Sequence, residues 1–507
     1  MKYLIGIDLG TSATKTVLFD QRGAIVSSSS AEYPLYQPQN GWAEQDPADW
    51  RRAAFSTIAG VIKASGVNPA DIAGVGISGQ MHGLVMLGED GEPLRNAIIW
   101  CDGRTERECA EITDIIGAKR LIELSANPAL PGFTASKIMW VRKHEPEIYA
   151  KCRHILLPKD YIRYALTGEF ATEVSDASGM NLLDVPRRGW SGEILDKLEI
   201  DGNMLPRMYE SCEVTGRVTA AAAASTGLAP GTPVVGGAGD NAAAAVGTGV
   251  VSGGRAFTTI GTSGVIFAHS DAVAIEPEGR VHAFCSAVPG AWTVMSCTLA
   301  AGMSLQWFRN NFCRAEMETA AAIGTDPYDL MGREAEQSPI GANRLLFLPY
   351  LMGERSPILD SSARGVFFGL SAMHTKRDMI RAVMEGVAYS QRECLDVLRG
   401  MGINPGSMTL CGGGATSPLW RSMLADVYAC PVCTVTSKEG PALGAAILAG
   451  VGAGLYNSVP EACAELVKTT PEQPPNAENG GKYEGYYKLY KELYPRLKDQ
   501  FSALMNL

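Results

Sequence analysis

The chain has 507 residues, of which 46% are hydrophobic and 19% charged, and its formal net charge is −10. A chain of this length needs two or three domains, its apolar share excludes a disordered protein, and its acidic balance argues against nucleic-acid binding. The longest stretch without a charged residue, between Arg280 and Arg309, is broken by Pro289-Gly290, so we expect no membrane span. Twelve cysteines without a disulfide framework, and an N-terminus without a secretion signal, favour a cytoplasmic protein.

The first elements predict the beginning of a mixed α/β domain. Strands are expected over residues 3–9, 15–19, 24–28 and 72–77, and a helix over 50–65. Asp49 is placed to cap that helix. Between the first two strands lies Gly10-Thr11-Ser12, a turn whose N–H groups and hydroxyls can face an anion, because glycine lets the backbone approach closely.

The same arrangement recurs from residue 256, where two expected strands flank the turn Gly261-Thr262-Ser263. The elements expected in this half are strands over 257–260, 265–269, 292–297, 344–348 and 408–411, and helices around 305–308 and over 376–399, 418–428 and 483–505. Two such turns indicate a duplicated domain whose copies face one polyphosphate from opposite sides. We place the domains at residues 1–247 and 248–507, divided in a stretch rich in Ala, Gly and Pro.

Asp240 is the central candidate for chemistry. It follows a short expected strand over 233–235 and the small residues 236–239, and it precedes an alanine-rich helix. The carboxylate either caps the helix or acts as a general base at a strand end, where open α/β sheets bind ligands. The small residues favour the base, since a cap needs no space cleared beside it.

Four other positions can bind a ligand, and each has a structural alternative. Asp8, at the end of the first strand, can organise Mg²⁺ through water or stabilise its own turn. Lys15 can add a charge near a phosphate or stay solvated. Residues 412–417 can hold adenine or ribose against bare backbone or form a tight strand–helix connection, and Met81-His82 can line a substrate pocket or be structural.

The two usual nucleotide-binding signatures are absent from the sequence. It has no G-x-x-x-x-G-K-[ST] and no G-x-G-x-x-G in a strand–helix unit. Phosphate binding is therefore expected from the two hairpin turns.

Together these residues resemble the FGGY family of carbohydrate kinases, whose superfamily includes actin and the heat-shock chaperone ATPases. The likeness covers nearly the whole chain. The segments that carry it are residues 5–12, 42–47, 100–104, 157–161, 236–241, 347–351, 353–357 and 365–370. Residues 79–83 and 131–134 are similar to those of members that act on D-xylulose.

The resemblance implies two duplicated ribonuclease-H-like domains of the actin and sugar-kinase type, with mixed sheets, flanking helices and a cleft between them. It implies that D-xylulose is phosphorylated with ATP and Mg²⁺, with Asp240 deprotonating the 5-hydroxyl and Asp8 serving the metal. The sugar site would also include Met81, His82, Trp100 and Asn241. The nucleotide contacts would be Gly10, Thr11, Ser12, Lys15, Gly261, Thr262, Gly413, Gly414 and Ser417.

The chain departs from the family at Ala13 and Thr14, where many relatives have Gly or Ser, so the outer hydroxyl contacts to phosphate stay open. Two alternatives also stay open. One is a kinase of the same family for another ketose or polyol, such as ribulose or erythritol. The other is a nucleotide-switched binding protein, in which Asp240 would have no hydroxyl to activate. We expect no nucleic-acid or membrane partner and allow for a homodimer.

Overall fold

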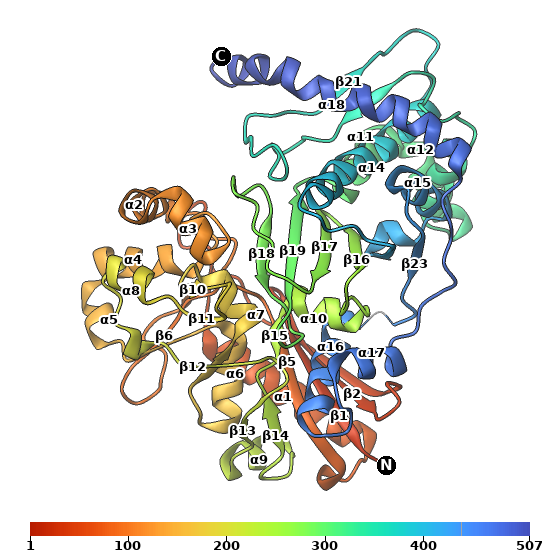
Figure 1. Cartoon of the computed structure of the whole chain (residues 1–507). Helices are drawn as coiled ribbons and strands as arrows, with labels where there is room; N and C mark the ends of the chain where they lie inside the picture. Colours follow the sequence, from red (N-terminus) through yellow and green to blue (C-terminus); the bar gives the residue numbers. More distant parts are fainter. Residues whose placement is uncertain (438) are drawn as a thin grey trace. The chain divides into compact units, whose positions relative to one another are not determined.

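The computed structural model describes residues 1–437 and 439–507, which form two compact units (Figure 1). The first unit comprises Met1–Ser252, His269–Thr293 and Ser437–Val467, and the second comprises Gly253–Ala268, Val294–Thr436 and Lys468–Leu507. Each unit therefore draws on separate stretches of the chain, whereas the domains inferred from the sequence are continuous. None of the helices in the described part of the chain has the length and apolar character needed to cross a membrane.

A seven-stranded sheet in the order β13-β14-β5-β1-β2-β3, with β15 also paired to β5, forms the base of the first unit. Its strands are β1 (Tyr3–Leu9), β2 (Ala13–Asp20), β3 (Ile25–Glu32), β5 (Ile72–Gly79), β13 (Val214–Arg217), β14 (Pro233–Val235) and β15 (Ala238–Gly239). β1, β2 and β3 form an antiparallel meander, while β5 runs parallel to β1, and β14 and β15 run parallel to β5. The parallel strands end at one edge of the sheet.

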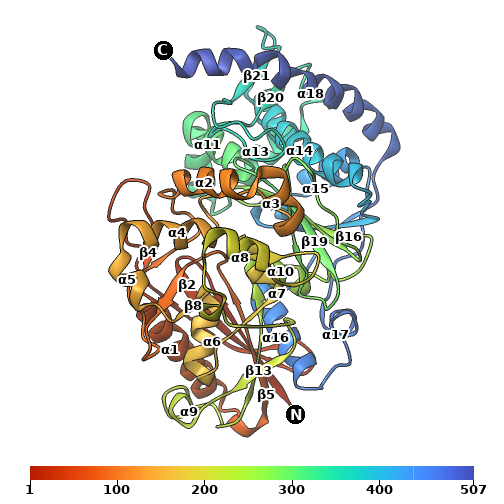
Figure 2. The ribbon, with the colours of Figure 1, turned by 60° about the vertical axis from the view of Figure 1, so that its left-hand side comes forward.

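Alternate residues of β1 face opposite sides of this sheet, as the pleat requires. Ile5 belongs to a core formed with α1 (Pro47–Ser65). Its neighbour Leu4 belongs to another core, which contains residues of α10 (Asp240–Gly247) and α16 (Gly440–Gly452). Helices α1 and α16 therefore cover opposite faces (Figure 2).

Helix α16 lies directly against the sheet at two glycines. A Cβ at Gly6 would come within 1.8 Å of the Ala442 carbonyl oxygen, and one at Gly76 within 1.9 Å of the Ala445 carbonyl oxygen. No side chain fits in either gap, so these two positions fix how close the helix comes to β1 and β5.

Helix α1 begins earlier than the sequence predicts. Its cap is Asp46, whose Oδ1 accepts the N–H of Ala48 at 2.9 Å, and Pro47 is the first helical residue. Proline fits that position because its missing N–H would have no partner there. The expected cap, Asp49, is wrong: this residue lies in the first turn and forms an ion pair with Arg52 at 2.6 Å.

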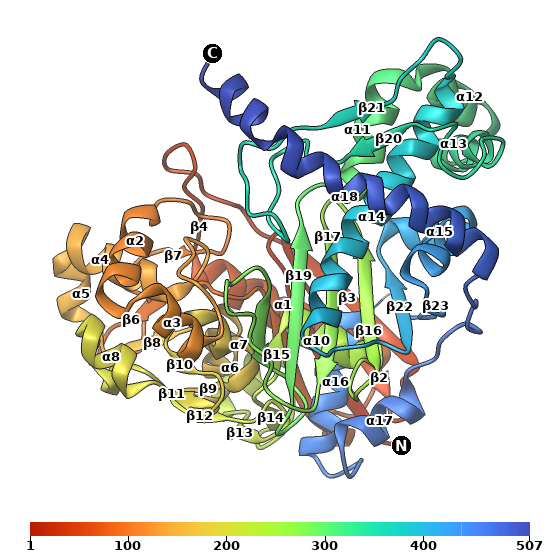
Figure 3. The ribbon, with the colours of Figure 1, turned by 45° about the horizontal axis from the view of Figure 1, so that its top comes forward.

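Helices α2 to α5 and α8 form a group of their own in the first unit (Figure 3). The remaining elements of this unit are β4 (Glu44–Gln45), β6 (Val85–Leu87), β7 (Ala97–Ile98), α2 (Glu106–Ile116), α3 (Ala118–Ser125), α4 (Thr134–His144), α5 (Pro146–Lys151), β8 (His154–Leu156), α6 (Pro158–Thr167), β9 (Ala171–Glu173), α7 (Val174–Ala177), β10 (Leu183–Asp184), β11 (Gly189–Trp190), α8 (Gly192–Leu198), β12 (Arg207–Tyr209), α9 (Ala220–Thr226), β18 (His282–Cys285) and α17 (Val459–Leu466).

The second unit repeats the strand arrangement of the first. β16 (Arg255–Ile260) pairs antiparallel with β17 (Gly264–Ser270) and parallel with β22 (Ser407–Cys411), as β1 does with β2 and β5. These strands belong to a six-stranded sheet with the order β18-β19-β17-β16-β22-β23, in which β19 is Trp292–Thr298 and β23 is Val432–Thr434. This shared topology confirms the duplication that the two turns predict.

The other elements of the second unit are α11 (Gly302–Phe312), α12 (Arg314–Ile323), α13 (Pro327–Glu336), β20 (Leu346–Leu348), β21 (Val366–Phe368), α14 (Lys376–Gly400), α15 (Pro418–Tyr428) and α18 (Ala477–Met505). Strand β20 begins two residues after the predicted start. Asn343 and Arg344 have φ angles of 56° and 73°, which a strand cannot adopt.

Candidate active site

Three neighbouring parallel strands bring the principal candidate residues to one edge of the first sheet. β5 lies between β1 and β15, and Ser78 of β5 is opposite Asp8 on one side and Ala238 on the other. Asp240 follows β15, and Met81-His82 follow β5. Because parallel strands present their carboxyl ends at the same edge, two carboxylates and a histidine converge where such sheets bind ligands.

Asp240 does not cap helix α10. The cap position is Gly239, and Asp240 Oδ1 accepts the N–H of Asn241 at 2.7 Å and its side-chain amide at 3.1 Å. A capping carboxylate would accept an N–H two or three residues further on. Burial, and then the charge of Asp8, raise the pKa of Asp240 to about 7, while the bonds from Asn241 oppose this. A carboxylate with this pKa suits a general base near neutral pH.

The small residues before Asp240 serve packing. The prediction that they clear space beside its carboxylate is wrong. A Cβ at Gly237 would lie 2.0 Å from the carbonyl oxygen of Ile77, and one at Gly239 would lie 2.8 Å from Cγ of Met81. These glycines let β15 approach β5 closely and leave room for the methionine side chain. Their role is therefore to place Asp240.

Asp8 is a partly buried carboxylate with charged neighbours. The Ser78 hydroxyl donates to its Oδ1 at 3.3 Å. Burial raises the pKa of Asp8 to about 6, with Glu439 adding to the rise and Ser78 and Lys15 opposing it. Lys15 is partly exposed on its strand, and its Nζ pairs with Glu439 Oε1 at 2.5 Å, at the start of α16.

The first turn is held from two sides. Gln45 donates its side-chain amide to the Thr11 carbonyl at 2.7 Å, and the half-exposed Trp100 donates its indole N–H to the Thr11 hydroxyl at 2.9 Å. Ser12 is exposed, whereas Thr14 is fully buried in β2. Trp100, which was predicted to bind the sugar, therefore contacts Thr11, which was predicted to bind phosphate.

His82 is fixed at the same edge by several contacts. Its backbone has a φ of 69°, its Nδ1 lies 2.8 Å from the Gly179 carbonyl oxygen, and its ring stacks on Phe133 with a centroid distance of 4.4 Å. A carbonyl partner places the proton on Nδ1 in the neutral tautomer, which makes Nε2 an acceptor. Met81 is buried beside it.

Sequence reasoning assigned no role to several residues of this region. Phe133 lies in the family segment 131–134, and His282 and Phe284 of β18 approach its ring with centroid distances of 5.9 and 6.3 Å. Gly179 and the β18 residues carry no local signal, because the chain brings them there only on folding. Phe133 could have been selected from the sequence, because it lies in the segment 131–134 that carries the family resemblance.

A buried charge cluster lies behind Asp240. Lys159 Nζ contacts carboxylate oxygens of Asp160 at 2.7 Å, Glu173 at 3.3 Å and Asp176 at 3.5 Å, and all four side chains are fully buried. One ammonium cannot balance three carboxylates. Burial raises the pKa of Asp176 well above its ordinary range, with Lys159 opposing the rise and Asp240 among the charges that add to it. Burial therefore favours the protonated form of Asp176.

The remaining nucleotide candidates lie in the second unit. The Thr262 carbonyl accepts the N–H of Met303 at 3.2 Å, and Gly302 donates to Gly261 at 2.7 Å, so the start of α11 holds the second turn. Gly413 and Gly414 follow β22, the parallel neighbour of β16. Their turn therefore lies at the same sheet edge as the Gly261-Thr262 turn. Ser417 caps α15 by accepting the N–H of Trp420 at 3.3 Å.

Comparisons with known proteins define the class. The N-terminal domain of the FGGY family of carbohydrate kinases matches residues 3–247, and the C-terminal domain of that family matches residues 256–453. The chain belongs to the FGGY family and is a carbohydrate kinase with the two-domain fold of actin-like sugar kinases.

Particular relatives extend over the whole chain. A xylulose kinase of Bacillus subtilis (strain 168) is 40% identical over 506 residues, covering 100% of this chain and 99% of the relative. The crystal structure of xylulose kinase from Rhodospirillum rubrum is 29% identical with a TM-score of 0.91, covering 99% of this chain and 100% of that one. A gluconokinase of Bacillus licheniformis is 31% identical over 514 residues, with coverage of 99% and 98%.

Proposed function

We propose that this kinase transfers the terminal phosphoryl group of ATP to the 5-hydroxyl of D-xylulose, giving D-xylulose 5-phosphate. The names of the full-length relatives support the sugar. The observation that carries the chemistry is the position of Asp240, directly after β15 and at the same sheet edge as Asp8, with its pKa raised to about 7. A base of this kind can accept the hydroxyl proton as the phosphoryl group is transferred.

In this proposal the first unit binds the sugar. Met81, His82, Asn241 and Trp100 line the sugar site. His82, with its ring fixed by Phe133 and Gly179, can accept a hydrogen bond from a sugar hydroxyl at Nε2. The Asn241 amide holds one oxygen of Asp240, which orients the carboxylate.

Asp8 is the residue that fits a magnesium ion bound with ATP. Among residues 1–437 and 439–507, no group of three or more His, Cys, Asp or Glu side chains forms a metal cage. Mg²⁺ needs no such cage, because it usually takes one or two carboxylates together with waters and substrate phosphates. A bound Mg²⁺ would neutralise phosphate charge, and Asp8 would hold it from the protein side.

The nucleotide contacts that we propose lie in turns that follow sheet strands. Gly10, Thr11, Ser12, Lys15, Gly261 and Thr262 would contact the phosphates. Gly413, Gly414 and Ser417 would contact the adenosine. Gly413 supports this role, since a Cβ built there would meet no atom within 4 Å. Lys15 would have to share its charge with Glu439.

Gluconate is a second candidate substrate, because a gluconokinase also matches the full chain. A coupled assay of ADP release with D-xylulose, D-ribulose, erythritol and D-gluconate separates the candidates. We expect kcat/KM for D-xylulose to exceed the others by about a hundredfold, since a site that hydrogen-bonds one sugar leaves polar groups unpaired with another. A higher kcat/KM for gluconate would overturn the substrate and leave the kinase class intact.

A further inference from the structure

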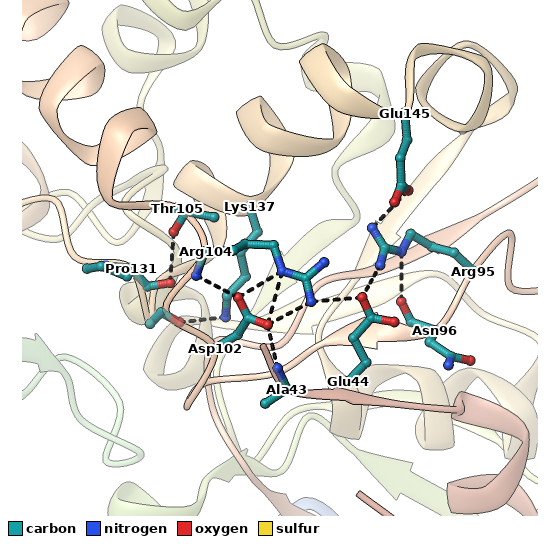
Figure 4. A network of polar contacts seen from close by, with 11 residues as sticks. Ala43, Glu44, Arg95, Asn96, Asp102, Arg104, Thr105, Pro131, Lys137 and Glu145 are labelled. Carbon is teal, nitrogen blue, oxygen red and sulfur yellow. Dashed lines mark hydrogen bonds and ion pairs between the residues drawn. The ribbon is translucent and has the colours of Figure 1, made fainter. Parts of the chain in front are cut away.

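Lys137 is a buried lysine close to His82, and among residues 1–437 and 439–507 it forms no ion pair with a carboxylate. It lies in the first turn of α4, and its side chain is fully buried. Its Nζ donates to the Gly132 carbonyl at 2.6 Å and to the His82 carbonyl at 2.8 Å. Figure 4 shows the side chain beside Asp102 and Arg104; the Asp102 carboxylate is engaged by the Arg104 guanidinium, at 2.7 Å from Nη2.

This is an unfavourable place for an ammonium group. Burial disfavours the charged form and lowers the pKa of Lys137 to about 7. A cation in the first turn of a helix is also disfavoured by the helix dipole. An apolar side chain of similar length would fill the same space without these costs. What the ammonium adds is the link between two carbonyls that belong to separate loops.

One of these loops carries His82 of the proposed sugar site, and the other carries the ring against which His82 stacks. The loop after β5 contains His82, whose left-handed backbone conformation is costly for a residue other than glycine. Its carbonyl accepts a second hydrogen bond, from the Thr134 hydroxyl at 3.1 Å. The other loop carries Phe133, on which the His82 ring stacks. The segment 132–137 therefore holds both the backbone and the ring of the histidine.

We propose that Lys137 is a positioning residue for the sugar, acting through His82: by joining the His82 and Gly132 carbonyls, it holds the histidine against Phe133 in the conformation that meets the substrate. This inference rests on the proposed function, in which the sugar binds at His82. Lys137 itself does not contact the sugar, because it is buried behind the loop.

The test is a double-mutant cycle between Lys137→Met and His82→Ala, measured as kcat and KM for the sugar and KM for ATP. Lys137→Met should raise the sugar KM about tenfold and leave the ATP KM unchanged. Lys143→Met is the matched control, because Lys143 lies on the same helix but is partly exposed and pairs with Glu111. Its KM values should match the wild type.

The cycle separates positioning from a general structural role. In the His82→Ala background, Lys137→Met should change the sugar KM less than twofold, because residues that act through one another are not additive. An equal effect in both backgrounds, or no effect in the wild type, would overturn the inference. The cycle uses whichever sugar the wild type phosphorylates best, so rejection of D-xylulose in the substrate panel would be seen separately.

If circular dichroism shows that Lys137→Met does not fold, the Thr134→Val variant can be used to test whether the bonds to the His82 carbonyl position the histidine. This change removes the second donor to the His82 carbonyl and keeps the side-chain shape. A raised sugar KM at an unchanged melting temperature supports the positioning role, and an unchanged KM contradicts it.

Discussion

Asp8 and Asp240 lie on either side of β5, at the ends of two strands that both pair with it in parallel, and the charge of Asp8 adds to the burial that raises the pKa of Asp240. The two carboxylates are therefore coupled through space. This coupling can be measured, because only one of the pair is proposed as the base.

The pH dependence of kcat/KM should report the ionisation of Asp240. The base works only when deprotonated, so kcat/KM for the sugar should fall as pH drops below about 7. Asp8→Asn removes a negative neighbour and should move this midpoint to lower pH. Burial, the larger cause, remains, so the midpoint should stay above the ordinary value of 3.8. The profile is measured on the residual activity, and a midpoint that rises or stays in place contradicts the coupling.

Asp240→Asn should abolish most activity and yet stabilise the fold at high pH. Loss of a general base costs about 10²- to 10⁴-fold in kcat. The folded protein holds the Asp240 proton up to about pH 7, whereas the unfolded chain releases it near 3.8, so wild-type stability declines across this window. Asparagine does not ionise, so the stability of the variant should not show this decline with pH. Thermal melts should show a higher transition temperature for the variant at pH 8, with the difference shrinking toward pH 4.

Gly179→Ala should disturb the proposed sugar site through a side-chain clash, since the backbone of Gly179 is not in the left-handed region. The added methyl would lie 2.2 Å from Nδ1 of His82, and the ring cannot move aside without leaving Phe133. We expect the sugar KM to rise about tenfold or more, with the KM for ATP unchanged. Gly192→Ala is the control, since a Cβ there meets no atom within 4 Å. Equal kinetics for the two variants would show that His82 does not bind the sugar.

Lys159→Met and Asp176→Asn should differ sharply in stability. Removing the lysine leaves Asp160, Glu173 and Asp176 buried without their cation, which costs about 3–5 kcal/mol when a buried pair is broken. Asparagine at position 176 replaces a carboxyl group whose neutral form burial favours, so this change should cost little. The free energy of unfolding of both variants can be measured by chemical denaturation monitored by fluorescence. A large loss for Asp176→Asn would mean that Asp176 is ionised in the folded protein.

Local patterns predicted the sheet strands and the residues at their ends. β-branched runs placed β1, β5 and β16 within two residues of their bounds, and the Gly–hydroxyl turns indicated the duplication. Asp8 could be selected because it lies near the end of such a strand, and Asp240 because it follows the expected strand over 233–235 and a run of small residues. Their joint location at one sheet edge follows from parallel pairing, which sequence order alone does not give.

Contacts between distant segments could not be predicted in the same way. Lys15 looked solvated or phosphate-binding until folding brought Glu439 beside it, 424 residues away. The buried Lys137 and the close approach of Gly179 to His82 likewise depend on loops that meet only in the folded chain. The wrong prediction of the α1 cap has a local cause. Pro47 favours the first helical position, which makes Asp46 the cap and not Asp49.

Helix α16 completes the layer behind β1 and β5, although it is encoded about 360 residues after β5 in the chain. On the ribosome, the sheet that carries Asp8 and Asp240 is therefore synthesised long before the helix that covers it. The nascent chain must keep this bare glycine-lined surface from aggregating until residue 452 has left the exit tunnel. Truncation of the gene before that point should yield insoluble protein, even though the strands that carry Asp8 and Asp240 would be present.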